Sequence, residues 1–117
     1  MNKPLILPHL LDDPATWAGR DWEPFHEGVE ISWIRRPDHP DGPRSALLRY
    51  APGTGVPRHS HAAFEYILIL DGAQSDANGR HEAGTLVVNP PGTSHTVHSD
   101  VGCVVLAVWE APVKFVD

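Results

Sequence analysis

Apolar residues in this chain occur in short runs that turn-forming residues separate. Twelve prolines and ten glycines punctuate the sequence, and no segment keeps a helical spacing of apolar residues for three or four turns without one of them. The pattern therefore predicts strands. They are expected at residues 29–36, 45–50, 58–61, 64–70, 73–76, 80–82, 85–88, 95–98, 103–109 and 113–116. Many short strands at regular spacing are typical of an antiparallel sandwich or barrel, so we expect an all-β fold.

Two dipeptides that contain glycine mark specific turns between these strands. Asn78-Gly79 suits the positive φ of a two-residue hairpin turn, which predicts that residues 73–76 pair with residues 80–82. Asp71-Gly72 is expected to end the preceding strand in another turn.

The first 27 residues differ from the rest of the chain. They carry Trp17, Trp22 and Phe25 among prolines and acidic residues, with no alternating pattern. We interpret residues 1–27 as an ordered arm that packs on the barrel or on a partner subunit. Residues 28–117 then form the barrel, and a chain of 117 residues is the usual size of a single domain.

Composition and charge exclude several classes of protein. With 41% hydrophobic and 21% charged residues, the chain resembles an ordinary globular protein. A net charge of −6 with scattered basic residues argues against a nucleic-acid partner. The apolar stretch Leu5-Ile6-Leu7 is too short for a signal peptide, and no run approaches a membrane span. The lone cysteine, Cys103, excludes an internal disulfide, and we expect a cytoplasmic protein with no membrane or nucleic-acid partner.

The most informative segment reads His-Ser-His-Ala-Ala-Phe-Glu. Side chains two positions apart on a strand face the same side, so His59 and His61 can reach one ion. Glu65 follows after a tight link and can supply an oxygen ligand. His95 is the best candidate for a fourth ligand, because the sharp turn Pro90-Pro91-Gly92 comes just before it.

Three imidazoles and one carboxylate suit iron, manganese, cobalt, nickel, copper or zinc better than magnesium or calcium. Four ligands on one side of an ion leave positions open for water or substrate. Without an ion, these groups would be buried unpaired at considerable cost. We therefore predict one divalent transition metal ion per chain. His9, His26, His39 and His81 are expected at the surface, and alternation places His98 on the face opposite His95.

Two spaced motifs resemble those of the cupin superfamily. Gly53-x5-His59-x-His61-x3-Glu65-x6-Gly72 matches the first cupin motif at every defined position, and Gly84-x5-Pro90-x-Gly92-x2-His95 matches the second. The usual closing Asn of the second motif is Ser99 here. The resemblance implies a double-stranded β-helix, or jelly-roll barrel, with the ion in its mouth.

A finer resemblance covers residues 28–112. The segments Leu48-Arg-Tyr-Ala-Pro-Gly53, Pro57-Arg-His-Ser-His61 and Asn89-Pro-Pro-Gly-Thr-Ser-His95 are similar to the cupin domain of ChrR-type anti-sigma factors. Similar barrels occur as stand-alone proteins and in dioxygenases that cleave diketones or hydroxyacetophenones. The anti-sigma factors also have a helical zinc module that holds the sigma factor, and this chain has no counterpart of it. Sigma binding is therefore not carried over.

An apolar pocket is expected beside the metal. Alternation from Glu65 turns Ile67 and Ile69 inward, and alternation from His95 turns Val97 inward, which suits a small organic ligand or substrate. Trp33, Arg49 and Tyr50 are further candidates for the rim, although packing or surface roles are favoured for them. Cys103 lies in an apolar run and is interpreted as a buried core residue rather than a redox-sensing thiol.

Two functions remain open from the sequence. The first is a metal-dependent enzyme, a dioxygenase acting on a small enolisable or phenolic substrate, with Glu65 as a ligand or as a general base. The alternative is a non-enzymatic regulatory module that senses a metal or ligand, as the ChrR resemblance implies. A metal-free sugar-processing cupin is less favoured, because that chemistry does not need the full ligand set. By analogy with small cupins, we expect a homodimer with the arm or an edge strand at the contact.

Overall fold

The computed structural model describes residues 3–116, and most of this part of the chain is extended. The strands are β1 (Glu23–His26), β2 (Val29–Arg35), β3 (Arg44–Tyr50), β4 (Thr54–His61), β5 (Glu65–Asp76), β6 (Gly79–Glu82), β7 (Leu86–Asn89), β8 (Ser94–Ser99), β9 (Cys103–Trp109) and β10 (Val113–Phe115). One helix, α1 (Ala15–Ala18), precedes them within the described residues. The all-β prediction is confirmed.

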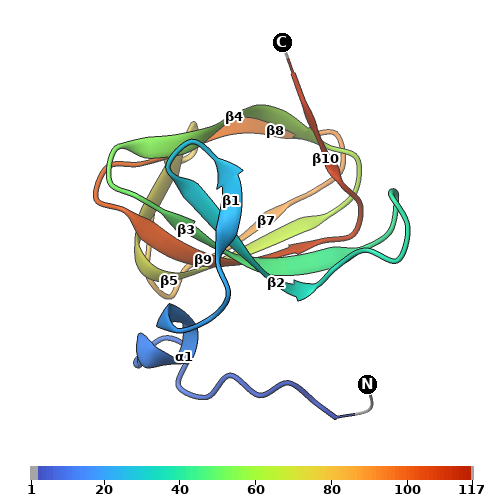
Figure 1. Ribbon diagram of the computed structural model, residues 1–117. Coiled ribbons are helices and arrows are strands. Elements are labelled where there is room, and N and C mark those ends of the chain that lie inside the picture. Colours follow the sequence, from blue (N-terminus) through green and yellow to red (C-terminus); the bar gives the residue numbers. More distant parts are fainter. Residues whose placement is uncertain (1–2, 117) are drawn as a thin grey trace.

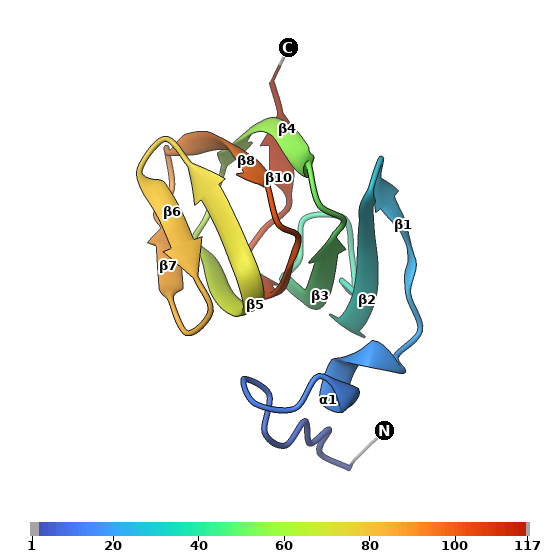
Figure 2. The ribbon, with the colours of Figure 1, turned by 90° about the vertical axis from the view of Figure 1, so that its left-hand side faces the viewer.

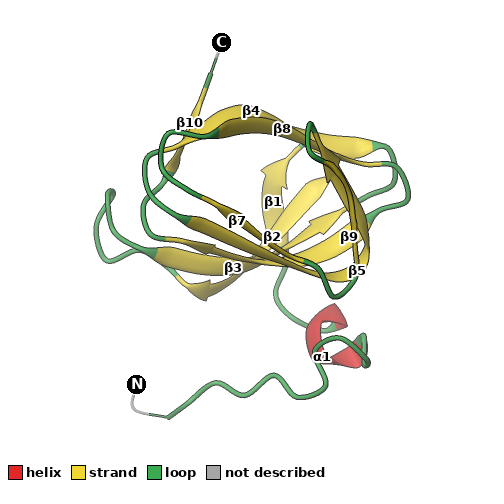
Figure 3. Ribbon diagram, turned by 180° about the vertical axis from the view of Figure 1, so that it is seen from behind, coloured by secondary structure: helices red, strands yellow, loops and turns green. Residues whose placement is uncertain are grey.

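The strands form a single curled sheet in the order β1-β2-β3-β9-β5-β8-β4-β10, with β6 and β7 also paired to β5, and every pairing is antiparallel. In Figure 1, β4 and β8 arch over β2, β3 and β9, so the sheet encloses an interior. The view from behind shows the same closure, with α1 outside the barrel (Figure 3). The fold is a jelly-roll barrel, as predicted.

The long strand β5 joins the two halves of the barrel. Its first half pairs with β7 and β9, and its second half pairs with β6 and β8. The predicted turn at Asp71-Gly72 is wrong, because the strand continues through these residues with a bulge between Ile69 and Asp71. Gly72 has a φ of 73°, and a Cβ there would overlap the carbonyl oxygen of Gly102. Glycine at this position therefore allows the strand to bend, and it does not end the strand. The predicted hairpin is present, but its two turn residues are Ala77 and Asn78, because Gly79 already belongs to β6 and pairs with Asp76.

Two apolar clusters stabilise the fold. Alternate residues of the strands fill the barrel interior, and this cluster includes Ile31, Leu48, Ile69 and Val105. A second cluster lies on the outer face of the sheet, where Trp17 of α1 packs with other buried residues. Its buried members are Trp17, Leu47, Leu70 and Val104, and Leu10, Trp22, Ile34, Leu68 and Leu106 pack against them.

Leu10, Trp17 and Trp22 therefore pack against the barrel of their own chain, and this part of the chain lies below the sheet in Figure 2. Burying one large apolar side chain contributes about 1.5–3 kcal/mol, so the second cluster attaches the arm firmly. The expected arm boundary at residue 27 falls within the sheet, because β1 pairs with β2. Within residues 3–116, α1 is far too short to cross a membrane.

Candidate metal centre

Four predicted ligands meet at one end of the barrel interior. His59 and His61 come from the end of β4, Glu65 begins β5, and His95 lies on β8 directly across from His59 in the antiparallel register. One ligand atom from each residue lies within 4.8 Å of the others. All four residues are between 4% and 9% exposed. The geometry brings together the complete set that the sequence predicted.

Each histidine is oriented by a partner on its Nδ1 atom. The Nδ1 of His59 lies 2.9 Å from the carbonyl oxygen of Pro57, and that of His61 lies 2.9 Å from Thr93 Oγ1. The Thr93 hydroxyl donates its proton to the Pro90 carbonyl at 2.6 Å, so its oxygen accepts from His61. His95 Nδ1 lies 3.4 Å from the Asp76 carboxylate. Because each of these partners accepts, each Nδ1 carries the proton.

The Nε2 atoms therefore carry no proton, and their lone pairs face one another. His59 Nε2 and His95 Nε2 are 3.0 Å apart, although neither tautomer has a proton to place between them. His61 Nε2 is buried without a hydrogen-bond partner among the described residues. It lies 3.0 Å from Glu65 Oε1, but not in the geometry of a hydrogen bond. Lone pairs that face one another beside a carboxylate repel each other when no ion is bound. A bound cation removes this repulsion, so the arrangement suits a metal site.

Glu65 is held in its ionised form. Its Oε1 accepts a hydrogen bond from Asn89 at 2.9 Å, and its Oε2 accepts one from Trp109 Nε1 at 2.6 Å. Burial alone would raise the pKa of this carboxyl, but a proton on the adjacent His61 and the hydrogen bond from Trp109 both favour the carboxylate and hold the pKa below its ordinary value. The carboxylate is therefore available as an anionic ligand at neutral pH.

The histidines are poised in the form that metals bind. Burial lowers the pKa of His59 and of His95 below the ordinary value, so both rings are neutral at pH 7. A metal ion requires a neutral imidazole with a free nitrogen lone pair. Neutral rings with Nδ1 already engaged meet that requirement without rearrangement.

Asp76 supports the site from behind His95. Its side chain is buried at the end of β5 and also accepts a hydrogen bond from His81 Nε2 at 3.1 Å. Burial would raise the pKa of the Asp76 carboxyl, but hydrogen bonds from His81 and from the backbone N–H of Asn78 outweigh this and hold the pKa low. An ionised carboxylate behind a ligating histidine fixes the orientation of the ring. His81, expected at the surface, is thus part of this supporting network.

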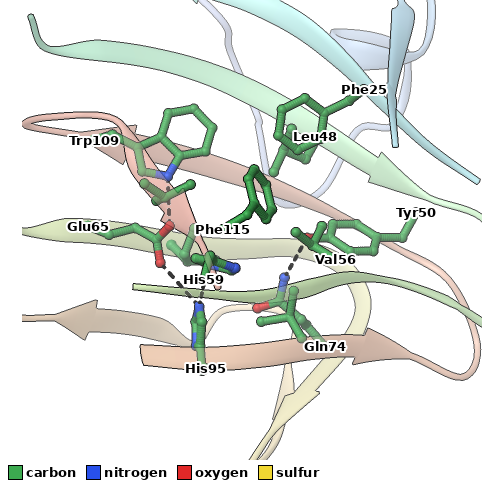
Figure 4. Close-up of a pocket in the computed structure, with 13 residues that line it drawn as sticks. Phe25, Leu48, Tyr50, Val56, His59, Glu65, Gln74, His95, Trp109 and Phe115 are labelled. Atoms are coloured by element: carbon green, nitrogen blue, oxygen red, sulfur yellow. Dashed lines mark hydrogen bonds and ion pairs between the residues drawn. The ribbon is translucent and has the colours of Figure 1, made fainter. Parts of the chain in front are cut away.

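A cavity of about 30 Å³ opens beside the ligands (Figure 4). Its wall includes His59, Glu65 and His95, the polar residues Tyr50 and Gln74, and the apolar residues Phe25, Leu48, Val56, Ile67, Val97, Trp109, Val113 and Phe115. The wall is therefore mainly apolar next to the metal-ligating atoms.

Not all the residues expected beside the metal belong to this wall. Ile67 and Val97 line the cavity, whereas Ile69 is fully buried in the interior core next to the β5 bulge. Of the rim candidates, Tyr50 lines the cavity. Arg49 instead lies over the Trp22 ring and pairs with Glu30, and the Trp33 indole donates to Glu23.

Several supporting residues escaped the sequence analysis. Asn89 and Trp109 lie across from Glu65 on the two strands that flank β5, a relationship set by register rather than by nearby sequence. The Thr93 contact with His61 could have been suspected, because Thr93 belongs to the Pro-rich turn before His95.

A jelly-roll barrel with three histidines and a glutamate gathered inside one end is a cupin. The model of the ChrR cupin-like domain family matches residues 15–114, and the chain belongs to that family. The anti-sigma-E factor ChrR of Cereibacter sphaeroides is 31% identical over 105 residues, which cover 86% of this chain and 49% of that protein. The chain thus spans about half the length of the curated relative it matches.

Solved structures share the barrel. The Rhodobacter sphaeroides complex of SigE with the anti-sigma ChrR matches with 25% identity and a TM-score of 0.71, over 80% of this chain and 51% of that one. An acetylacetone dioxygenase from Acinetobacter johnsonii matches with 17% identity and a TM-score of 0.74, over 82% of this chain and 72% of that one. An RmlC-like cupin from Ralstonia eutropha matches with 20% identity and a TM-score of 0.74, over 83% of this chain and 67% of that one. The last two likenesses concern the fold alone.

Proposed function

We propose that this cupin binds one divalent transition metal ion through His59, His61, Glu65 and His95, and that it is a dioxygenase-like enzyme acting on a small organic substrate. The observation that carries the proposal is the position of the four ligands in the wall of, or next to, a mainly apolar cavity. A purely structural metal site is closed on all sides by protein ligands, whereas this arrangement leaves one side toward the cavity.

The residues of the chain have separate tasks in this proposal. Pro57, Thr93 and Asp76 hold the three imidazoles with Nε2 directed at the ion. The bound metal would supply Lewis-acid activation of a substrate oxygen and, for a redox-active metal, electrons for reaction with dioxygen. The apolar wall would exclude water and hold the carbon skeleton of the substrate.

Glu65 suits ligation better than proton transfer. A general base works best when its pKa is close to the working pH, and the pKa of Glu65 is held low. Both carboxylate oxygens already accept a hydrogen bond, from Asn89 and from Trp109. We therefore place Glu65 as an anionic ligand and treat its role as a general base as secondary.

Oxygen uptake tests the enzymatic proposal. Iron-loaded protein should consume dioxygen with at least one member of a panel of diketones, flavonols and hydroxyacetophenones, and His61→Ala should not. His98→Ala is a matched control, because His98 lies on β8 with an exposed side chain paired to Asp100. If iron-loaded protein consumes no dioxygen with any member of the panel, the proposal is wrong.

A regulatory role is the second candidate, and family membership favours it. The 31% identical relative is an anti-sigma factor, and the chain matches about half of that protein. In this alternative, binding of metal or ligand changes a surface that a protein partner recognises. Affinity capture with metal-loaded and metal-free protein, under reducing and oxidising conditions, tests it. Failure to retain a specific partner in all conditions would count against it.

We also propose a homodimer formed through the outer face of the sheet. Leu86 and Val88 of β7 are exposed there, and Val108 of β9 lies on the same face across Tyr66. Phe64 is exposed beside them and stacks on the Tyr66 ring at 6.1 Å between centroids. A contiguous apolar patch on a small protein marks an interaction site. Light scattering of the wild type and of Val88→Lys measures the oligomeric state directly.

The location we propose is the cytoplasm. Cys103 is a free, buried thiol, which fits a reducing compartment.

A further inference from the structure

The cavity wall contains a second polar group besides the metal ligands. Gln74 of β5 donates from Nε2 to the hydroxyl oxygen of Tyr50 of β3 at 3.3 Å, and the two residues are 3% and 4% exposed. Figure 4 shows the Gln74 amide directed into the same space as His59 and His95. Every remaining residue of the wall is apolar, so this pair is the second polar anchor that the cavity offers.

The hydrogen-bonding capacity of the pair is only partly used. Among residues 3–116, the Gln74–Tyr50 bond is the one hydrogen bond that either side chain makes. As oriented, Gln74 Oε1 remains as an acceptor and the Tyr50 hydroxyl proton as a donor. Turning the amide over leaves the amide NH₂ as a donor and the Tyr50 oxygen as an acceptor. In both arrangements the pair presents at least one donor and at least one acceptor to the cavity.

Burial keeps the Tyr50 hydroxyl a donor. It raises the pKa of Tyr50 well above its ordinary value, so the phenol stays protonated throughout the physiological range. Buried amide and hydroxyl groups are normally paired, because leaving them unpaired costs stability. An unused donor and acceptor that face a cavity therefore indicate a ligand or water molecule that supplies the missing partners.

We propose that Tyr50 and Gln74 form a ligand subsite that selects a small, mainly apolar molecule with an oxygen function at each end. One oxygen lies at the metal ligands, and the other, a hydroxyl or carbonyl, pairs with Tyr50 and Gln74. The carbon skeleton between them packs on Ile67, Val97 and Trp109. The inference rests on the proposed function, because it takes the cavity as the place where the substrate binds.

A ligand of this length requires more space than the present cavity. A volume of about 30 Å³ holds only one or two water molecules. Phe115 can provide the space, because it is half exposed and belongs to β10, a three-residue edge strand whose one pairing within residues 3–116 is with β4. Rotation of its side chain toward solvent would enlarge the cavity at the cost of its ring contacts with His26 and His59, and Phe115 does not belong to the interior core cluster.

Calorimetric binding of two matched probes tests the subsite. Zinc-loaded protein is used, because zinc has no redox chemistry and cannot turn the probes over. 4-Hydroxyacetophenone and 4-methylacetophenone share the ketone and the ring and differ by a hydroxyl in place of a methyl. We expect wild-type protein to bind the hydroxylated probe at least tenfold more tightly. In Tyr50→Phe and in Gln74→Met this preference should fall below threefold, while zinc per chain stays unchanged.

The outcomes separate this inference from the proposed function. Wild-type protein that holds zinc but binds both probes equally, or binds neither, overturns the subsite and leaves the metal site standing. Variants that keep the tenfold preference also overturn it. Wild-type protein that takes up no metal contradicts the proposed function instead. If Gln74→Met fails to fold, Tyr50→Phe, which removes only the hydroxyl, decides the question alone.

Discussion

His59 and His95 lie directly opposite each other on β4 and β8, with their Nε2 atoms 3.0 Å apart. The Nδ1 of each ring is directed at an acceptor, the Pro57 carbonyl for His59 and the Asp76 carboxylate for His95. Both rings are therefore fixed in the tautomer whose free lone pair points into the site. The strand register thus places two of the candidate ligands opposite each other, and the acceptors on Nδ1 set the direction of their rings.

Removing one ligand should remove the metal and leave the barrel folded. We expect His61→Ala or His95→Ala to lose at least nine-tenths of the bound metal, because each contributes one Nε2 to the cluster. Large, fully buried side chains such as Ile31, Leu47 and Val105 lie outside the cavity wall, so circular dichroism should match the wild type. His98→Ala, whose side chain is 51% exposed, should keep its metal. Unchanged metal content in both ligand variants would remove these residues from the site.

Asp76 should matter for affinity although it does not reach the ion. Asp76→Asn removes the negative charge behind His95 Nδ1, and loss of such a supporting carboxylate lowers metal affinity by about 10–100-fold. Competition with a chromophoric chelator measures the change. Asp100→Asn is the matched control, because Asp100 pairs with the exposed His98 outside the site. Equal affinities of the two variants would show that Asp76 does not position His95.

Metal should stabilise the folded protein without being required for folding. When free ion is about 1,000 times the dissociation constant, binding adds about 4 kcal/mol to the free energy of unfolding. Urea unfolding with and without a chelator measures this difference. The same comparison on His61→Ala should give no difference. A metal-free wild type that is unfolded would contradict the expectation.

Cys103 should be chemically inert in the folded protein. Burial raises the pKa of its thiol to about 11, and the thiolate is the form that reacts. Iodoacetamide at pH 8 should label unfolded protein and leave the folded protein unlabelled over the same time. Rapid labelling of the folded protein would contradict this expectation and would favour a redox-sensing role for Cys103.

The sequence placed the four candidate ligands in one cluster because their positions are determined locally. His59 and His61 alternate on one strand, Glu65 follows after a tight link, and His95 stands just after a Pro-Pro-Gly turn. Short-range spacing was therefore enough to place all four on elements that converge.

Features that depend on distant parts of the chain were missed. The strand β1 contains Pro24 and has no alternation of its own, so it forms only through pairing with β2. Asp71-Gly72 resembles a turn, but the close approach of Gly102 makes it a bulge. Asp76 and Trp109 reach the ligands through strand register over long sequence separations, which single-sequence reasoning does not supply.

The metal content of tag-free protein purified without oxygen is the most direct test of the central claim. We predict close to one transition metal ion per chain, and iron, manganese, nickel or copper would favour the oxygenase over the regulatory role. Zinc at the same ratio would shift the balance toward sensing or binding. Protein that neither contains metal nor takes up any of these ions after dialysis against them would contradict the account.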